Sequence, residues 1–131
     1  MLIRQEELPM VALASMNDTH LEDIIMLNEL AKLIEDEKVE EISGKLDAML
    51  SHTVELFAAE EMMMQEKGFP AYSMHKAEHD RALAQMKEIV ESWKKHKELD
   101  VLRHYIEGIM PAWLVQHVST MDTVTARFLV S

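Results

Sequence analysis

The chain contains no cysteine, which excludes disulfides, zinc ribbons, thiolate iron–sulfur clusters and cysteine nucleophiles. With only 3 glycines and 3 prolines among 131 residues, it has little material for turns, so we expect a few long elements in one domain. No apolar run approaches the ~20 residues that a helix needs to cross a bilayer. These absences predict an α-helical protein that does not enter a membrane.

Positive charge is also scarce, because the formal net charge is −11. A phosphate backbone repels an acidic chain, so we expect no nucleic-acid partner. The first nine residues, M-L-I-R-Q-E-E-L-P, carry acids where a signal peptide needs a basic start and an apolar stretch. Together with the lack of cysteine, this predicts a cytoplasmic location.

Apolar residues recur every three or four positions in four segments, as on one face of an α-helix. The segments run from Asp18 or Thr19 to an acidic turn at 35–37, and over about 40–66, 72–96 and 99–128. Long amphipathic segments with short joints predict an all-α, antiparallel, up-down-up-down four-helix bundle. We expect one domain over residues 1–131, with residues 1–16 as an N-terminal arm over the core.

Local signals predict where the helices begin, end and bend. Thr19-x-x-Glu22 matches a capping box for the first helix. Gly68, followed closely by a proline, predicts the end of the second helix. Gly108 and Pro111 predict a kink or break early in the fourth segment. In that segment the expected inward stripe continues to Val124 and Phe128.

Side chains that bind metals interrupt these apolar stripes. They are His20, Glu60, His75, His79 and His117, followed by Asp122. A single core histidine is usually structural, but a buried carboxylate costs several kcal/mol unless it is paired or coordinates a cation. Five polar positions of this kind on the buried faces indicate a metal site.

Chain direction gives independent support for a single site. In an up-down-up-down bundle, the starts of the first and third helices lie beside the ends of the second and fourth. All six residues therefore converge at one level. His117 and Asp122 are about 140° apart on an ideal helix, so they share a face only if the helix is locally distorted or the Asp122 side chain reaches around it. Two carboxylates with several imidazoles favour two iron ions over one zinc ion.

Four motifs resemble those of the bacterial hemerythrins over residues 10–125: N-D-T-H, H-T-V-E-L-F-A-A-E-E-M-M-M, G-F-P-A-Y-S-M-H-K-A-E-H-D and W-L-V-Q-H-V-S-T-M-D. The resemblance implies a four-helix bundle with a non-haem di-iron centre that binds dioxygen. It implies that His75, His79 and His117 hold one iron and His20 the other. Glu60 and Asp122 would bridge the pair together with an oxo or hydroxo group.

One position departs from the family pattern, in which a histidine precedes the bridging glutamate by four residues. This chain has Leu56 there, and leucine cannot coordinate a metal. The second iron then binds weakly, binds with water or another side chain, or supports turnover instead of reversible binding. We expect His52 to lie one turn too far away and Glu55 and Glu61 to point elsewhere, which leaves water as the default ligand.

The leading functional prediction is a non-haem di-iron protein that binds dioxygen as a carrier, store or sensor. The alternatives are a peroxidase- or oxidase-type enzyme acting on peroxide, and a metal-binding bundle with a partly occupied or mononuclear iron site. We expect a monomer or weak homo-oligomer. Four apolar side chains are predicted to line the dioxygen pocket: Leu27, Phe57, Leu114 and Met121.

Overall fold

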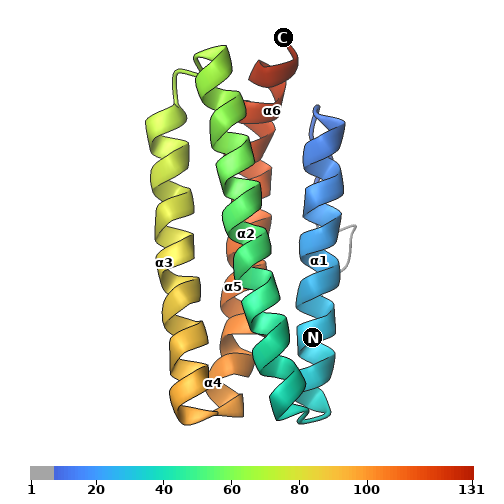
Figure 1. Ribbon diagram of the computed structural model, residues 1–131. Helices are drawn as coiled ribbons and strands as arrows, with labels where there is room; N and C mark the ends of the chain where they lie inside the picture. Colours follow the sequence, from blue (N-terminus) through green and yellow to red (C-terminus); the bar gives the residue numbers. More distant parts are fainter. Residues whose placement is uncertain (1–7) are drawn as a thin grey trace.

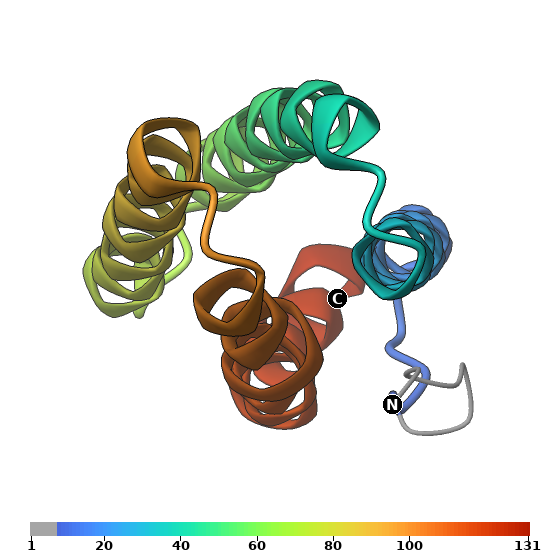
Figure 2. The ribbon, with the colours of Figure 1, turned by 90° about the horizontal axis from the view of Figure 1, so that it is seen from below.

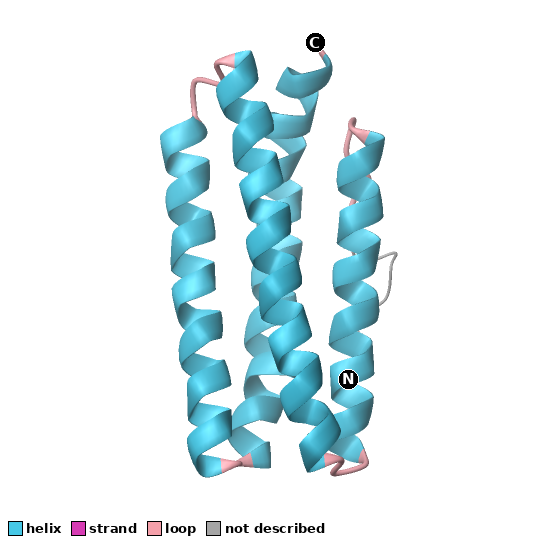
Figure 3. Ribbon diagram, in the orientation of Figure 1, coloured by secondary structure: helices cyan, strands magenta, loops and turns pink. Residues whose placement is uncertain are grey.

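The computed structural model describes residues 8–131, and none of these residues lies in a strand (Figures 1 and 3). Three long helices are followed by a fourth helical run of five pieces. Their bounds are α1 Ala14–Glu35, α2 Val39–Lys67, α3 Tyr72–His96, α4 Leu99–His104, η2 Tyr105–Ile109, α5 Met110–His117, η3 Val118–Asp122 and α6 Thr123–Val130. Seen end-on, the four runs stand around a common axis (Figure 2). The predicted antiparallel four-helix bundle is confirmed.

The described part of the arm is held against the bundle. Leu8 and Val11 are buried in the core. The side chain of Asn17 accepts a hydrogen bond from the Val11 amide at 2.8 Å and donates one to the Val11 carbonyl at 2.9 Å. The first seven residues, including most of the predicted acidic start, lie outside the described residues.

The first helix begins earlier than predicted, and the predicted capping box is wrong. Helix α1 starts at Ala14, and no side chain caps it. The hydroxyl of Thr19 instead donates to the carbonyl of Met16 at 2.9 Å, inside the helix. Contacts between the arm and the core extend the helix by a turn beyond its local start signal.

Glycine at the end of α2 behaves as its sequence context predicts. Gly68 adopts a left-handed conformation with φ of 65°, which side chains other than glycine adopt at a cost. The next amide, of Phe69, then donates to the carbonyl of Met64 at 2.9 Å. This closes α2 and turns the chain into α3.

One half of the bundle is an apolar core. The end of α1, the start of α2, the end of α3 and α4 meet there. The buried side chains there include Ile34, Ile42, Leu46, Trp93 and Leu102, each at most 2 % exposed. The indole of Trp93 donates to the Ser43 hydroxyl at 2.9 Å, which satisfies its polar group. The opposite half holds the predicted metal-binding side chains, so this core fixes the scaffold from which they project.

A kink or break was predicted at Gly108 and Pro111. The fourth helical run is instead continuous there, and it contains two π-helical turns. Gly108 lies in the first turn, at 105–109, and Pro111 opens the α-helix that follows. The second turn, at 118–122, shifts the buried face by one position. Val124 is therefore 56 % exposed, while Thr125 is fully buried. The predicted inward position of Val124 is wrong because it assumed regular α-helical spacing, whereas Phe128 is half-buried and packs against Phe69 with ring centroids 5.1 Å apart.

Among the described residues, no helix has the length and apolar character that crossing a membrane requires.

Candidate metal centre

Five potential metal ligands form a compact cluster between three of the four helical runs. Each offers a ligand atom within 4.8 Å of the corresponding atom of every other member: Glu60, His75, His79, His117 and Asp122. Glu60 comes from α2, and His75 and His79 come from α3. His117 and Asp122 come from the fourth run. Four of the five are at most 3 % exposed.

His20 joins this cluster from α1. Its Nε2 atom lies 2.9 Å from Oδ2 of Asp122, and its side chain is buried. All four helical runs therefore contribute to one site, at the end of the bundle where α1 and α3 begin. The structure brings together all six residues that the sequence singled out.

The π turn at 118–122 brings His117 and Asp122 onto one face. In this turn hydrogen bonds run from residue i to i+5, so residues five apart come into line. Nε2 of His117 lies 3.1 Å from Oδ1 of Asp122. Of the two alternatives, a distorted helix or an Asp122 side chain that reaches around it, the structure shows the distorted helix.

The carboxylates and imidazoles perturb one another strongly. Burial opposes protonation of His75, but the neighbouring carboxylates of Asp122 and Glu60 outweigh it and raise the pKa of His75 to about 9. Burial alone would raise the pKa of Asp122, but contacts from His117, His20 and His75 hold it well below its usual range. The cluster therefore keeps negative charge deep in the protein and balances it with imidazoles.

Three buried atoms that face the cluster make no hydrogen bond among the described residues: Glu60 Oε1, His79 Nε2 and Asp122 Oδ1. Buried polar atoms normally find a partner, because leaving one unsatisfied costs about 1–3 kcal/mol. Imidazole nitrogens and carboxylate oxygens that converge without partners are the donor set that iron accepts. The residues present therefore fit a metal centre.

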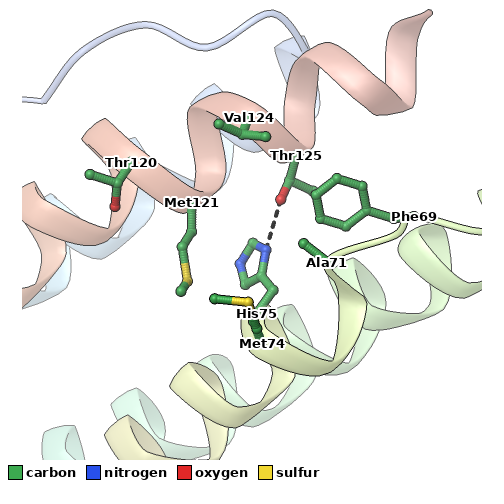
Figure 4. Close-up of a pocket in the computed structure, with 8 residues that line it drawn as sticks. All are labelled: Phe69, Ala71, Met74, His75, Thr120, Met121, Val124 and Thr125. Carbon is green, nitrogen blue, oxygen red and sulfur yellow. Dashed lines mark hydrogen bonds between the residues drawn. The ribbon is translucent and has the colours of Figure 1, made fainter.

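A second layer of side chains orients the histidines, and the sequence analysis missed it. Nδ1 of His75 lies 2.8 Å from the hydroxyl of Thr125, a contact drawn in Figure 4. Nδ1 of His79 lies 2.9 Å from a carboxylate oxygen of Glu61. Each contact leaves Nε2 directed into the cluster. Thr125 was hidden by the register shift of the π turn, whereas Glu61 was recognised only as pointing away from the site.

Two aromatic rings wall the cluster. Phe57 stacks on the ring of His79 with centroids 3.8 Å apart, and Trp113 stacks on His117 at 4.4 Å. The indole of Trp113 also donates to the Glu78 carboxylate at 3.0 Å, which fixes its plane. These rings hold the imidazoles in position and keep water from one side of the cluster.

Three cavities border the cluster, and the largest of them, of about 270 Å³, lies beside Glu60 and Leu56. A cavity of about 170 Å³ beside His75 has Phe69, Met74 and Met121 in its lining (Figure 4). A much smaller cavity, of about 20 Å³, lies beside His20 and is lined by both Phe57 and Leu114. Of the four residues predicted to line one pocket, these two lie at the small cavity, Met121 lies at the cavity beside His75, and Leu27 is in the apolar core.

Leu56 is half-buried on α2, one turn before Glu60, and lines the small cavity beside His20. Its position relative to Glu60 is that of a side chain able to face the cluster. An imidazole there would reach toward His20, whereas the leucine presents only methyl groups.

The family model of the hemerythrin HHE cation binding domain matches residues 10–129. This chain belongs to the hemerythrin family. A bacteriohemerythrin of Aquifex aeolicus is 35% identical over 129 residues, 98% of each chain. Another, from Methylococcus capsulatus, is 29% identical over 106 residues, or 81% of this chain and 79% of that protein. The crystal structure of a wild-type hemerythrin superimposes with a TM-score of 0.85 at 25% identity, covering 100% of this chain and 98% of that one.

Membership of the hemerythrin family and the buried cluster together support non-haem iron binding at this site. The shared fold extends over the whole bundle, so the likeness is not confined to the site.

Proposed function

We propose that this chain binds two non-haem iron ions and binds dioxygen reversibly between them and the wall of the small cavity. The observation that carries the proposal is the convergence of four imidazoles and two carboxylates in a buried cluster with unsatisfied ligand atoms. A carrier, a store and a sensor all require this site.

In the proposed arrangement His75, His79 and His117 hold one iron, and His20 holds the other. Supporting this division, the first three rings are mutual neighbours, with centroids 4.5 to 5.3 Å apart. His20 comes from a different helix and approaches only the far oxygen of Asp122.

Glu60 and Asp122 are the proposed bridges. Oε1 of Glu60 lies 3.1 Å from Nε2 of His75, and Oδ1 of Asp122 lies 3.2 Å from the same atom. Oδ2 of Asp122 faces His20 instead, so its two oxygens already address both halves of the site. When bound, the two iron ions would supply the electrons that hold dioxygen.

The chain's own contribution is to orient ligands and to limit access. Thr125 and Glu61 fix two of the imidazoles through Nδ1, and metal-bound histidines depend on such partners. Besides its metal-binding side chains, the small cavity beside His20 has an apolar wall that includes Phe57 and Leu114, and a small uncharged ligand can rest against this wall. This lining supports dioxygen as the ligand.

The test compares the iron-loaded wild-type protein with Leu56→His. Absorption spectra recorded through cycles of oxygenation and deoxygenation should show a reversible ligand-to-metal charge-transfer band in both proteins. The band should persist through more cycles in the variant. Rapid loss of the band, accompanied by peroxide-dependent oxidation of a dye, would instead support the peroxidase-type enzyme. A saturated iron content near one per chain would contradict the di-iron proposal.

Cytoplasmic location and the lack of nucleic-acid or membrane partners stay predictions of the acidic, cysteine-free composition.

A further inference from the structure

The proposed function leaves the second iron with one imidazole, from His20, and two shared carboxylates. Leu56 contributes no ligand atom, so any further protein ligand must come from elsewhere. Leu56 and His20 both line the small cavity, so the side chains around it are the candidates for such a ligand. Five side chains able to bind iron line this cavity: His20, Asp23, Glu60, His117 and Asp122. Asp23 is the one among them to which the proposed function gives no role.

We propose, on the basis of that function, that Asp23 is a ligand of the second iron and replaces the imidazole that Leu56 lacks. Asp23 lies three residues after His20 on α1, so the two side chains share a face of the helix. Carboxylate oxygens bind non-haem iron together with imidazoles, as in sites made of two histidines and one carboxylate. The ligand lost from α2 is thus replaced from the neighbouring helix.

The surroundings of Asp23 support this assignment. It lies close enough to His20 and Asp122 to interact electrostatically with both. Nε2 of His52 on α2 lies 3.6 Å from Oδ1 of Asp23 and 3.5 Å from Oε2 of Glu22. His52 is therefore an ion-pair neighbour of the Asp23 carboxylate, at a distance longer than a hydrogen bond, and metal-binding carboxylates commonly have such outer partners.

The other candidates for this place are committed to other contacts. Glu61 lies against Nδ1 of His79 at 2.9 Å, and Glu55 is exposed. The hydroxyl of Thr53 donates to the Met49 carbonyl at 2.8 Å. His52 faces the outer carboxylates of α1. Asp23 is the ligand that needs no change in these contacts.

A carboxylate in place of an imidazole also adds negative charge to the site. Net charge tunes the potential of iron centres, and negative charge favours the ferric state. The wild-type protein should therefore autoxidise faster than the double variant D23N/L56H, in which an imidazole from α2 takes over the ligand position of the Asp23 carboxylate.

The decisive measurement is the number and affinity of metal ions bound, obtained by anaerobic titration with Fe(II) and, separately, with Co(II). The variants are D23N, the double variant D23N/L56H, and E22Q as matched control. Glu22 is a neighbouring acid that contacts the same His52, but its side chain is 56 % exposed and does not line the cavity. Thermal unfolding of each metal-free protein checks that the bundle is intact.

We expect the wild type and E22Q to bind two ions per chain. Removing an outer partner of a ligand costs about 10–100-fold in affinity, so losing the ligand itself in D23N should weaken the second ion at least about 100-fold. The double variant should regain the second ion, because the imidazole that L56H introduces supplies the missing donor.

Two results would overturn the assignment while leaving the proposed function standing. One is a D23N protein that binds its second ion within about twofold of wild-type affinity, well below the loss expected even for an outer partner. The other is a double variant that stays deficient although Leu56→His alone binds two ions. A wild-type protein that saturates with one ion overturns both the di-iron function and the role of Asp23.

Discussion

Oδ1 of Asp122 lies 3.1 Å from Nε2 of His117, although the two residues are five positions apart and an α-helix would turn them onto different faces. The π turn at 118–122 makes this contact possible, and such turns occur frequently at functional sites. The π turn also determines which side chains of α6 face the core, and Thr125 is buried as a result.

Deleting Ser119 should preserve the site. Ser119 is exposed and lies within the π turn, so its removal converts the turn to regular α-helix while leaving the faces on both sides unchanged. Metal analysis should then give the same metal content per chain as the wild type. Inserting an alanine after Ser119 should instead rotate Asp122 by about 100° and abolish metal binding. Equal losses in both variants would refute this interpretation of the turn.

Thr125→Val should weaken metal binding without unfolding the bundle. The substitution keeps the shape but removes the hydroxyl 2.8 Å from Nδ1 of His75. Loss of such a partner costs about 10–100-fold in metal affinity. Thr125→Ser, which keeps the hydroxyl, is the matched control and should stay near wild type. Competition with a chelator measures both, and a wild-type affinity for the valine variant would contradict the role assigned to Thr125.

The metal-free protein should lose stability as the pH rises from neutral to about 9. The folded state raises the pKa of His75 from 6.5 to about 9, so protonation favours folding. This contribution is complete below pH 6.5 and is lost as the pH passes through about 9. It is on the order of 3 kcal/mol at most, before other groups are counted. Urea unfolding at pH 6.5 and 9 measures it.

The metal-loaded protein is the control for that experiment. A metal-bound imidazole cannot be protonated, so loading should remove this pH dependence and release protons at pH 7. Metal uptake should accordingly strengthen as the pH rises toward 9. A pH-independent affinity over this range would show that His75 is already neutral in the metal-free protein.

Leu30→Ala should destabilise the metal-free protein by about 2–5 kcal/mol, because it leaves a cavity in the apolar half of the bundle. Leu30 is fully buried, with 0 % exposed. Leu21→Ala on the same helix is the matched control, since Leu21 is 37 % exposed and should change stability by less than about 0.5 kcal/mol. Urea unfolding measures the change in the free energy of unfolding for both variants. Similar losses of stability in the two would contradict the assignment of Leu30 to the core.

Much of the centre was predictable because helical periodicity is local. The spacing of the stripes fixes which residues face inward, and chain direction fixes at which end they meet. His20 and Glu60 could thus be placed at one level, whereas Leu56 was recognised as a gap beside them only through the resemblance to the hemerythrin pattern. The three helices with regular spacing, α1 to α3, bury the predicted stripes almost without exception.

The sequence-based predictions failed where contacts with another part of the chain decide where a helix begins or which of its faces is buried. The start of α1 depends on the arm, and the faces of α6 depend on a π turn that no single residue specifies. The sequence by itself determined the helices, the metal-binding side chains and the missing imidazole. Only the tertiary structure decided that Thr125 and Glu61 orient His75 and His79, and that Asp23 lines the cavity next to Leu56. The physical reason is that these contacts join different helices, whose rotation and offset are set by packing and not by local periodicity.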